Sequence, residues 1–451
     1  MSSPVTLAIK NKFLALESRR LSGVLSSSDK PRTQFLTSAW WSFAAAVVAR
    51  GANLIAMVIC ARVLAQARFG EIAIVQSTVA MFGPLAGVGL GMTTTKFLAE
   101  HRLKEPDKAG RILGLSLVIA TVAGLLMTVS LILLAPLLAA KGLGSPRLAS
   151  TLVAGSGLLF LSVLEAVQTG ALAGLEAFAR IAALSIWSGL LSVPITAFLV
   201  HRYGVNGAIA GMTVAVGLSC LLNGVVLRKE CRRLGMRINL AGCFSEWRIL
   251  PTFSLPAYLS GIIVAPVSWA ANAILVRQHD GLSQMALFSA ADRWRFVLIF
   301  VPIAVSRIAV PQFSRLYSEG DSHGYRRIFR LNLLFGTAMT AVPAIACAAL
   351  AAPLMSMYGR TFRQGSLVLV ILALSAIPTI LNTQLGFALL GANRAWLRSS
   401  IDFILAGLFL GCSWLAVPRW GAAGLAGSFF AAYSTASLIL YFCVRRLHAT
   451  T

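Results

Sequence analysis

Residues 200–211 read VHRYGVNGAIAG, and residues 417–427 read VPRWGAAGLAG. A constant offset of 217 residues aligns the two stretches, and other like residues along the chain fall on the same offset. The aligned pairs are Glu165 with Asn382, Gly174 with Gly391, Arg202 with Arg419, Gly204 with Gly421, Gly207 with Gly424, Arg228 with Arg445, and Lys229 with Arg446. This many coincidences at one offset indicate an internal repeat, in which the second half of the chain copies the first.

The composition is typical of a helical membrane protein. Of 451 residues, 57% are hydrophobic and 12% are charged, whereas a soluble protein carries about 25% charged residues. Twelve apolar blocks are each long enough to cross about 30 Å of hydrocarbon as a helix. The expected spans are 39–61, 71–95, 112–135, 150–171, 180–200, 206–227, 252–276, 286–311, 329–351, 366–391, 396–417 and 421–444.

The repeat and the spans together predict an all-α polytopic fold. Six spans precede the middle of the chain and six follow it, so both copies insert the same way up and form a parallel repeat. The expected division is a basic tail (1–37), a first six-helix bundle (38–228), a linker (229–250), a second bundle (251–446) and a C-terminal tail (447–451). A solvated basic loop is a sufficient interpretation of the linker. A substrate cavity is expected between the bundles.

The charge distribution predicts the orientation. The formal net charge is +24, which favours orientation by positive charges and contact with anionic lipid over nucleic-acid binding. With the N-terminus inside, inner segments hold 26 Lys and Arg residues, outer loops hold 9 and spans hold 4. Both termini of this multi-pass membrane protein are therefore expected to lie in the cytoplasm. The outer loops are all short, which disfavours an external catalytic domain.

One expected span carries an unusual cluster of charges. Residues 285–300 read MALFSAADRWRFVLIF and contain Asp292, Arg293 and Arg295. Charges at membrane depth usually face a cavity or a partner. Asp292 and Arg295 are three residues apart and can pair on one helix face, which leaves Arg293 without that partner. Arg307 lies about 21 Å further along; it either extends a cationic track or reaches the cytoplasmic interface.

Other intramembrane polar residues are candidates for substrate or ion contact. Arg50 and Asn53 are three residues apart and share a helix face. Arg50 either contacts the substrate or pairs with a carboxylate such as Glu165. Glu165 and Gln168, and with less support Asp402, are candidates for ion coupling; Glu165 is equally suited to be a buried partner of an arginine.

Several classes of chemistry lack their sequence signals. There is no GxxxxGK[ST] phosphate-binding loop, no HExxH and no GxSxG. The seven cysteines include no CxxC pair, so neither a zinc site nor a disulfide framework is expected. We therefore expect no catalytic residues, no metal site and no cofactor. The energy for transport is expected to come from an ion gradient, a membrane potential or mass action.

The segment CARVLAQARFGEIAIVQSTVAMFGPLAGVGLGMTTTKFLAEHR (60–102) resembles the opening of a known family. The family is that of the polysaccharide-biosynthesis flippases in the multidrug/oligosaccharidyl-lipid/polysaccharide (MOP) exporter superfamily. Residues at matching positions are Arg62, Phe69, Gly70, Gly87, Gly89, Phe97 and Glu100. The glycine pairs that open the sixth and twelfth spans also look like this family.

The resemblance implies a fold and a function. The fold is two six-helix bundles in a V, as in MATE-like transporters. The function is to move an undecaprenyl-pyrophosphate-linked oligosaccharide across the inner membrane for O-antigen, capsule or exopolysaccharide synthesis. Implied partners are that substrate, membrane lipids, and a glycan polymerase with its chain-length machinery. The alternatives are a MATE-type drug/cation antiporter, which favours an acidic cavity, and a membrane glycan polymerase or ligase.

Overall fold

The computed structural model describes residues 29–87, 89–239, 242–247, 263–319, 322–391 and 394–450, and these residues contain helices and no strand. The first half contains α2 (Asp29–Val63), α3 (Gln66–Gly87), α4 (Leu90–His101), α5 (Pro106–Leu137), the π-helix η1 (Leu138–Gly142), α6 (Leu148–Ala154), α7 (Ser156–Gly174), α8 (Phe178–Arg233) and η2 (Cys243–Glu246). The second half contains α10 (Val264–Val276), α11 (Gly281–Glu319), α12 (Ser322–Ala349), α13 (Ala351–Ser356), η4 (Arg360–Gly365), α14 (Ser366–Gly391) and α15 (Ala395–Thr450).

The two longest helices are hairpins that turn at the repeated glycines. The backbone of Gly204 in α8 has φ 60° and ψ −133°, and that of Gly421 in α15 has φ 53° and ψ −128°. Only glycine adopts such positive-φ backbone at little cost. In α8, a Cβ on Gly211 would contact the backbone of Thr196, although these residues would lie about 22 Å apart along one straight helix. The chain therefore reverses at Gly204.

The hairpins confirm both the repeat and the number of spans. The bounds of α8, shifted by 217 residues, coincide with those of α15. Among the described residues, eight helical stretches are long and apolar enough to cross a membrane, and the two hairpins are among them. Counting both arms of each hairpin, together with the apolar α10 and the charge-bearing α11, gives twelve crossings. The predicted all-α fold of two parallel six-helix units is confirmed.

One expected span is broken. The predicted second span, 71–95, is divided between α3 and α4, and Gly89 at the break has φ 66°. The side chain of Thr95 in α4 donates to the carbonyl of Gly170 in α7 at 2.8 Å. A Cβ on Gly170 would overlap the backbone of Gly91, so the glycines allow α4 and α7 to pack closely.

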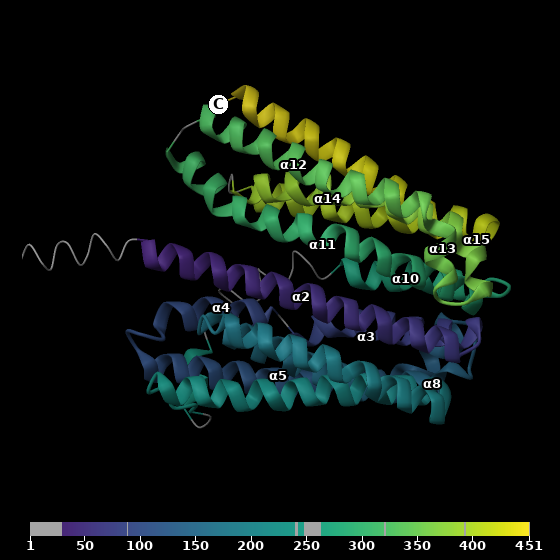
Figure 1. The fold of residues 1–451 in the computed structure, drawn as a ribbon, viewed down its shortest axis with the longest axis horizontal. Coiled ribbons are helices and arrows are strands. Elements are labelled where there is room, and N and C mark those ends of the chain that lie inside the picture. The colour runs from purple at the N-terminus through teal and green to yellow at the C-terminus, as the bar shows by residue number, and fades with distance from the viewer. Residues whose placement is uncertain are drawn as a thin grey trace, which may run out of the picture.

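The two halves form a V, whose arms diverge toward the end at which α2 begins and α15 ends (Figure 1). α2 to α8 make one arm and α10 to α15 make the other. At the opposite end the arms meet where α3 packs against α10 and α11. Arg62 donates from Nε to the carbonyl of Met357 at 2.7 Å there. The ring of Phe69 contacts the rings of Tyr358 and Phe362 at centroid distances of 6.2 and 5.7 Å.

Contacts between repeat-related residues locate the axis of the repeat. Gln66 Nε2 donates to the carbonyl of Ser283 at 3.2 Å, and Arg293 Nη2 donates to Gln76 Oε1 at 2.6 Å. In both pairs the two residues are 217 positions apart. Two equivalent positions can touch only where the axis passes between them, so the axis runs between α3 and α11.

The predicted domain boundaries shift in the structure. α2 begins inside the expected tail of residues 1–37, α8 continues into the expected linker, and α15 continues through the expected C-terminal tail to Thr450. Residues 1–28 and 248–250 lie outside the described part of the chain.

The described part of the linker is docked on the first bundle instead of forming a solvated loop. A Cβ on Gly110 or Gly114 of α5 would overlap the carbonyl of Arg237 or Asn239. Arg111 donates to Glu246 at 3.1 Å. The two glycines let the linker backbone approach one face of α5 closely, and the ion pair holds it there.

Candidate functional site

Arg293 joins the two bundles. It lies on α11, and its guanidinium donates to Gln76 Oε1 on α3 at 2.6 Å and to Asn53 Oδ1 on α2 at 3.3 Å. Its Nε is buried and has no hydrogen-bond partner among the described residues. As the residue spacing suggested, Asp292 pairs with Arg295 and forms no ion pair with Arg293. Two neutral amide oxygens leave the positive charge of Arg293 uncompensated, so the site suits an anion.

Arg50 lies in the same cleft as Arg293. A cavity of about 460 Å³ between α2 and α11 is lined by Arg50, Asn53, Arg293 and Phe296, and Ser185 of α8 also reaches it. The guanidinium carbon of Arg50 lies 3.9 Å from the ring centroid of Phe300. This cation–π contact positions the guanidinium but leaves its hydrogen-bond donors for a ligand. We call this cavity the central cleft.

The Asp292–Arg295 pair has a structural role. Arg295 Nε donates to Asp292 Oδ1 at 2.6 Å, and the Arg295 residue is 5% exposed. Its guanidinium lies 4.2 Å from the ring centroid of Phe429 on α15. Arg295 thus points into the second bundle, where its charge is paired and stacked. Arg307 is in α11, but its side chain lies outside the described residues.

Glu165 lies in a separate cavity within the first bundle. This cavity of about 400 Å³, the first-bundle chamber, is enclosed by α2, α7 and α8 and also reached by Gln76 of α3. The hydroxyl of Ser219 donates to the Glu165 carboxylate, and no Arg50–Glu165 ion pair forms among the described residues. Gln168 is one turn from Glu165, and its buried Oε1 has no partner among the described residues. Asn53 and Ser185 line both the chamber and the central cleft, so the two cavities adjoin.

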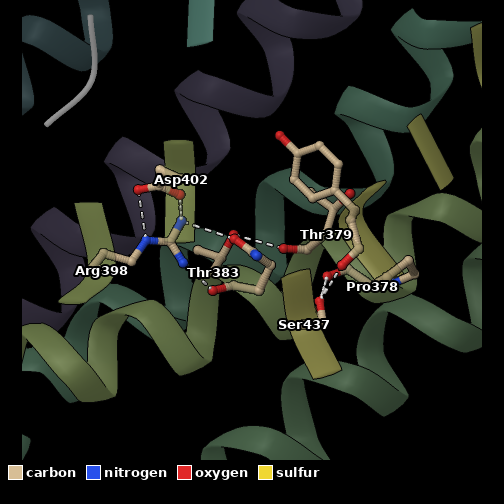
Figure 2. Close-up of polar contacts among 8 residues, drawn as sticks. Pro378, Thr379, Thr383, Arg398, Asp402 and Ser437 are labelled. Carbon is tan, nitrogen blue, oxygen red and sulfur yellow. Dashed lines mark hydrogen bonds and ion pairs between the residues drawn. The ribbon is translucent and has the colours of Figure 1, made fainter. Parts of the chain in front are cut away.

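Asp402 occupies a different environment, inside the second bundle. Arg398 pairs with it at 2.8 Å and also donates to the backbone and side-chain oxygens of Asn382, both at 2.9 Å. Figure 2 shows Arg398 reaching Asp402 on the same helix and the α14 segment that carries Thr379 and Thr383. This network was not predicted from the sequence, although the four-residue spacing of Arg398 and Asp402 is that of a helical ion pair.

Gln76 is a second residue that the sequence analysis left without a role. It is the position equivalent to Arg293 at the offset of 217, and the structure places the two in contact. The predicted site residues thus divide into three groups. Arg50, Asn53 and Arg293 meet in the central cleft; Glu165 and Gln168 belong to the first bundle; Asp292, Arg295 and Asp402 are held in ion pairs.

Comparison with solved structures shows the fold. An inward-facing multidrug-resistance MATE family transporter of the MOP superfamily superposes with a TM-score of 0.78 at 14% identity, covering 88% of this chain and 94% of that one. The lipid II flippase MurJ in an inward closed conformation gives a TM-score of 0.71 at 14% identity, covering 90% and 87%. The V of two bundles is therefore the MOP-type transporter fold.

Comparison with known sequences shows the family. The EPS I polysaccharide export inner membrane protein EpsE of Ralstonia nicotianae is 23% identical over 411 residues, which cover 89% of this chain and 92% of that protein. The EpsE protein of Ralstonia solanacearum is 22% identical over 413 residues. The family model described as polysaccharide biosynthesis protein matches residues 35–317. The chain, with its two repeated six-helix bundles, therefore belongs to the polysaccharide biosynthesis protein family.

Proposed function

We propose that this protein is a flippase that moves undecaprenyl-pyrophosphate-linked oligosaccharides across the bacterial inner membrane for the synthesis of a surface polysaccharide. The observation that carries the proposal is the pairing of Arg50 and Arg293 in one cleft between the bundles. A pyrophosphate cannot cross hydrocarbon without compensation of its charge. Guanidinium groups match phosphate oxygens in geometry and charge, and the apolar tail can remain in lipid.

The same observation supports a flippase over an antiporter of cationic drugs. Such a substrate requires anionic groups in its path, whereas the charged side chains among the described residues of the central cleft are Arg50 and Arg293. The relatives named for polysaccharide export support the flippase. A polymerase or ligase would need a catalytic constellation, and the cleft offers arginine, amide and aromatic side chains. A polymerase and its chain-length machinery are proposed partners.

The proposed orientation places both termini in the cytoplasm. With this orientation, the arms of the V diverge toward the cytoplasm and meet at the outer side. The state described is then inward-facing, ready to load a substrate made on the cytoplasmic face.

Glu165 is the proposed site of ion coupling. Its carboxylate lies in a chamber that adjoins the central cleft, one turn from the buried Gln168, and Asn53 lines both cavities. Asp402 is a weaker candidate because Arg398 already compensates its charge. Glu165→Gln should remove the dependence of transport on an imposed proton gradient, whereas Asp402→Asn should keep it. Retention of the dependence in Glu165→Gln would reject this assignment.

A deletion strain tests the flippase proposal. Loss of the protein should abolish surface polysaccharide and accumulate the lipid-linked unit facing the cytoplasm. Arg50→Ala and Arg293→Ala should fail to complement at normal membrane levels, and Arg50→Lys and Arg293→Lys should retain part of the activity because they keep the charge. Normal surface polysaccharide in the deletion strain would refute the function; full complementation by both alanine variants would refute the site.

A further inference from the structure

The first-bundle chamber has a lining rich in hydroxyl and amide groups. Side chains from α2, α7 and α8 contribute Asn53, Thr169, Ser185, Ser188, Ser192 and Asn223. Ser188 and Ser192 donate to backbone carbonyls one turn earlier in α8, so their oxygens can still accept hydrogen bonds from a ligand. The chamber has a volume of about 400 Å³ and shares Asn53 and Ser185 with the central cleft.

The repeat provides an internal comparison for this chamber. Cys220 Sγ donates to the carbonyl of Leu161 in the first bundle, and Ser437 Oγ donates to the carbonyl of Pro378 in the second. Shifting the first pair by 217 residues gives the second pair. The contact of α7 with the second arm of α8 beside the chamber is therefore repeated between α14 and α15 in the second bundle, so the side chains at equivalent positions of these helices can be compared.

Three of the equivalent positions in the second bundle carry aromatic side chains, and the ion pair of Arg398 and Asp402 stands at the positions of Ile181 and Ser185. Phe409 stands at the position of Ser192, Phe429 at that of Met212, and Tyr433 at that of Val216. The ring centroids of Phe409 and Phe429 are 5.7 Å apart, and those of Phe429 and Tyr433 are 4.3 Å apart. The cavity that remains beside them has a volume of about 10 Å³.

Among the described residues, the compared side chains of the second bundle thus pack against one another, whereas the equivalent positions of the first bundle line a polar chamber. Interiors normally pack densely, because each unfilled volume forfeits contacts. The sequence of the second bundle shows that this helix arrangement can be filled. The unfilled, hydroxyl-lined copy adjoins the arginines of the central cleft, so it lies where the sugars of a pyrophosphate-linked oligosaccharide would begin.

We propose that the first-bundle chamber is the sugar subsite of the transporter, and that it receives the sugar residues nearest the pyrophosphate while Arg50 and Arg293 hold the phosphates. The sugar head group then binds within the first bundle, away from the repeat axis between α3 and α11. The charged side chain among the described lining residues is Glu165, held by Ser219. A fixed carboxylate repels acidic sugars, so the subsite is suited to neutral or amino sugars. This inference rests on the proposed flippase function.

Exchange of equivalent residues between the bundles tests the subsite. The double variant Ser192→Phe/Val216→Tyr gives the first bundle the aromatic side chains of the second. Binding to purified protein in detergent is measured for two probes: a polyprenyl pyrophosphate that carries the oligosaccharide, and the same polyprenyl pyrophosphate without sugar. We expect the variant to lose at least about tenfold in affinity, or about 1.4 kcal/mol, for the sugar-bearing probe and to bind the sugar-free probe as the wild type does.

Two further variants keep the test decisive. Ser188→Leu introduces the residue found at the equivalent position 405 of the second bundle. It fills less of the chamber than the double variant does, and it replaces the double variant in the test if that variant does not fold. Phe409→Ser/Tyr433→Val, the reverse exchange, should leave the affinity for both probes unchanged. Unchanged affinity of the chamber-filled variants for the sugar-bearing probe would overturn the subsite. If the wild type binds neither probe, the flippase proposal itself fails, and the subsite with it.

Discussion

The contact between α3 and α11 at the closed end of the V depends on a glycine. A Cβ on Gly70 would overlap the backbone carbonyl of Leu282, and a backbone carbonyl cannot rotate away as a side chain can. Gly70→Ala therefore forces the two helices apart. Overpacking of this kind costs about 1–3 kcal/mol. Since 1.4 kcal/mol is about a factor of ten, the population closed at this end should fall roughly 5- to 150-fold relative to states in which the helices have separated.

Distances between spin labels measure this shift. Lys141 of η1 and Gln364 of η4 are exposed residues on different bundles near the closed end, and labels there should report a longer distance in Gly70→Ala. The matched control is Gly83→Ala on the same helix, where an added Cβ meets nothing within 4 Å. Both changes raise helix propensity equally, so the comparison isolates the overlap. Identical distance distributions for Gly70→Ala, Gly83→Ala and wild type would refute the close approach of α3 and α11.

Two predictions concern stability. Asp292→Ala leaves the Arg295 charge buried without its partner, which should cost about 3–5 kcal/mol of stability and lower the midpoint of thermal unfolding. The double variant Asp292→Ala/Arg295→Met should recover most of this loss. A double variant as unstable as Asp292→Ala would contradict the assignment as a structural pair. Gly204→Ala and Gly421→Ala each place a side chain at positive φ, which should cost about 1–3 kcal/mol. Both midpoints should fall below that of Gly427→Ala, which has open space around the added Cβ, and the fall should be larger for Gly421→Ala because its Cβ would also lie 2.9 Å from Gln284 Oε1. Midpoints no lower than that of Gly427→Ala would contradict the positive-φ reversals.

The fold was accessible from the sequence because its determinants are local or periodic. Span lengths follow from apolar blocks, and Gly204 and Gly421 mark the same reversal in each half. The break between α3 and α4 was less accessible, because the apolar pattern continues across Gly89 and the interruption is a matter of backbone conformation.

The site was only partly accessible, because contacts between helices do not follow from spacing within one helix. The spacing correctly set Arg293 apart from the Asp292–Arg295 pair. Its contact with Gln76 depends on where the repeat axis passes, which the offset alone does not give. Arg398 lies near the start of the expected span 396–417, four residues before Asp402, and its pairing with Asp402 was not predicted.

The chamber was not predicted at all. Its lining residues are small and polar, and each is unremarkable where it stands in an apolar helix. Only when Ser192 is compared with Phe409, and Val216 with Tyr433, does the sequence show that one bundle is hollow where the other is filled. That comparison requires both the offset and the knowledge that these positions face the bundle interior.

The central claim is that the cleft at Arg50 and Arg293 carries a lipid-linked oligosaccharide across the membrane. The most direct measurement uses purified protein in lipid vesicles, with the lipid-linked oligosaccharide initially in one leaflet and its sugar detected by a lectin or glycosidase that acts from the other side. We expect transfer with the wild-type protein and, with Arg50→Ala/Arg293→Ala, a rate no higher than that of protein-free vesicles. Absence of transfer by the folded wild-type protein under an imposed ion gradient, or equal transfer by the double variant, would contradict the claim.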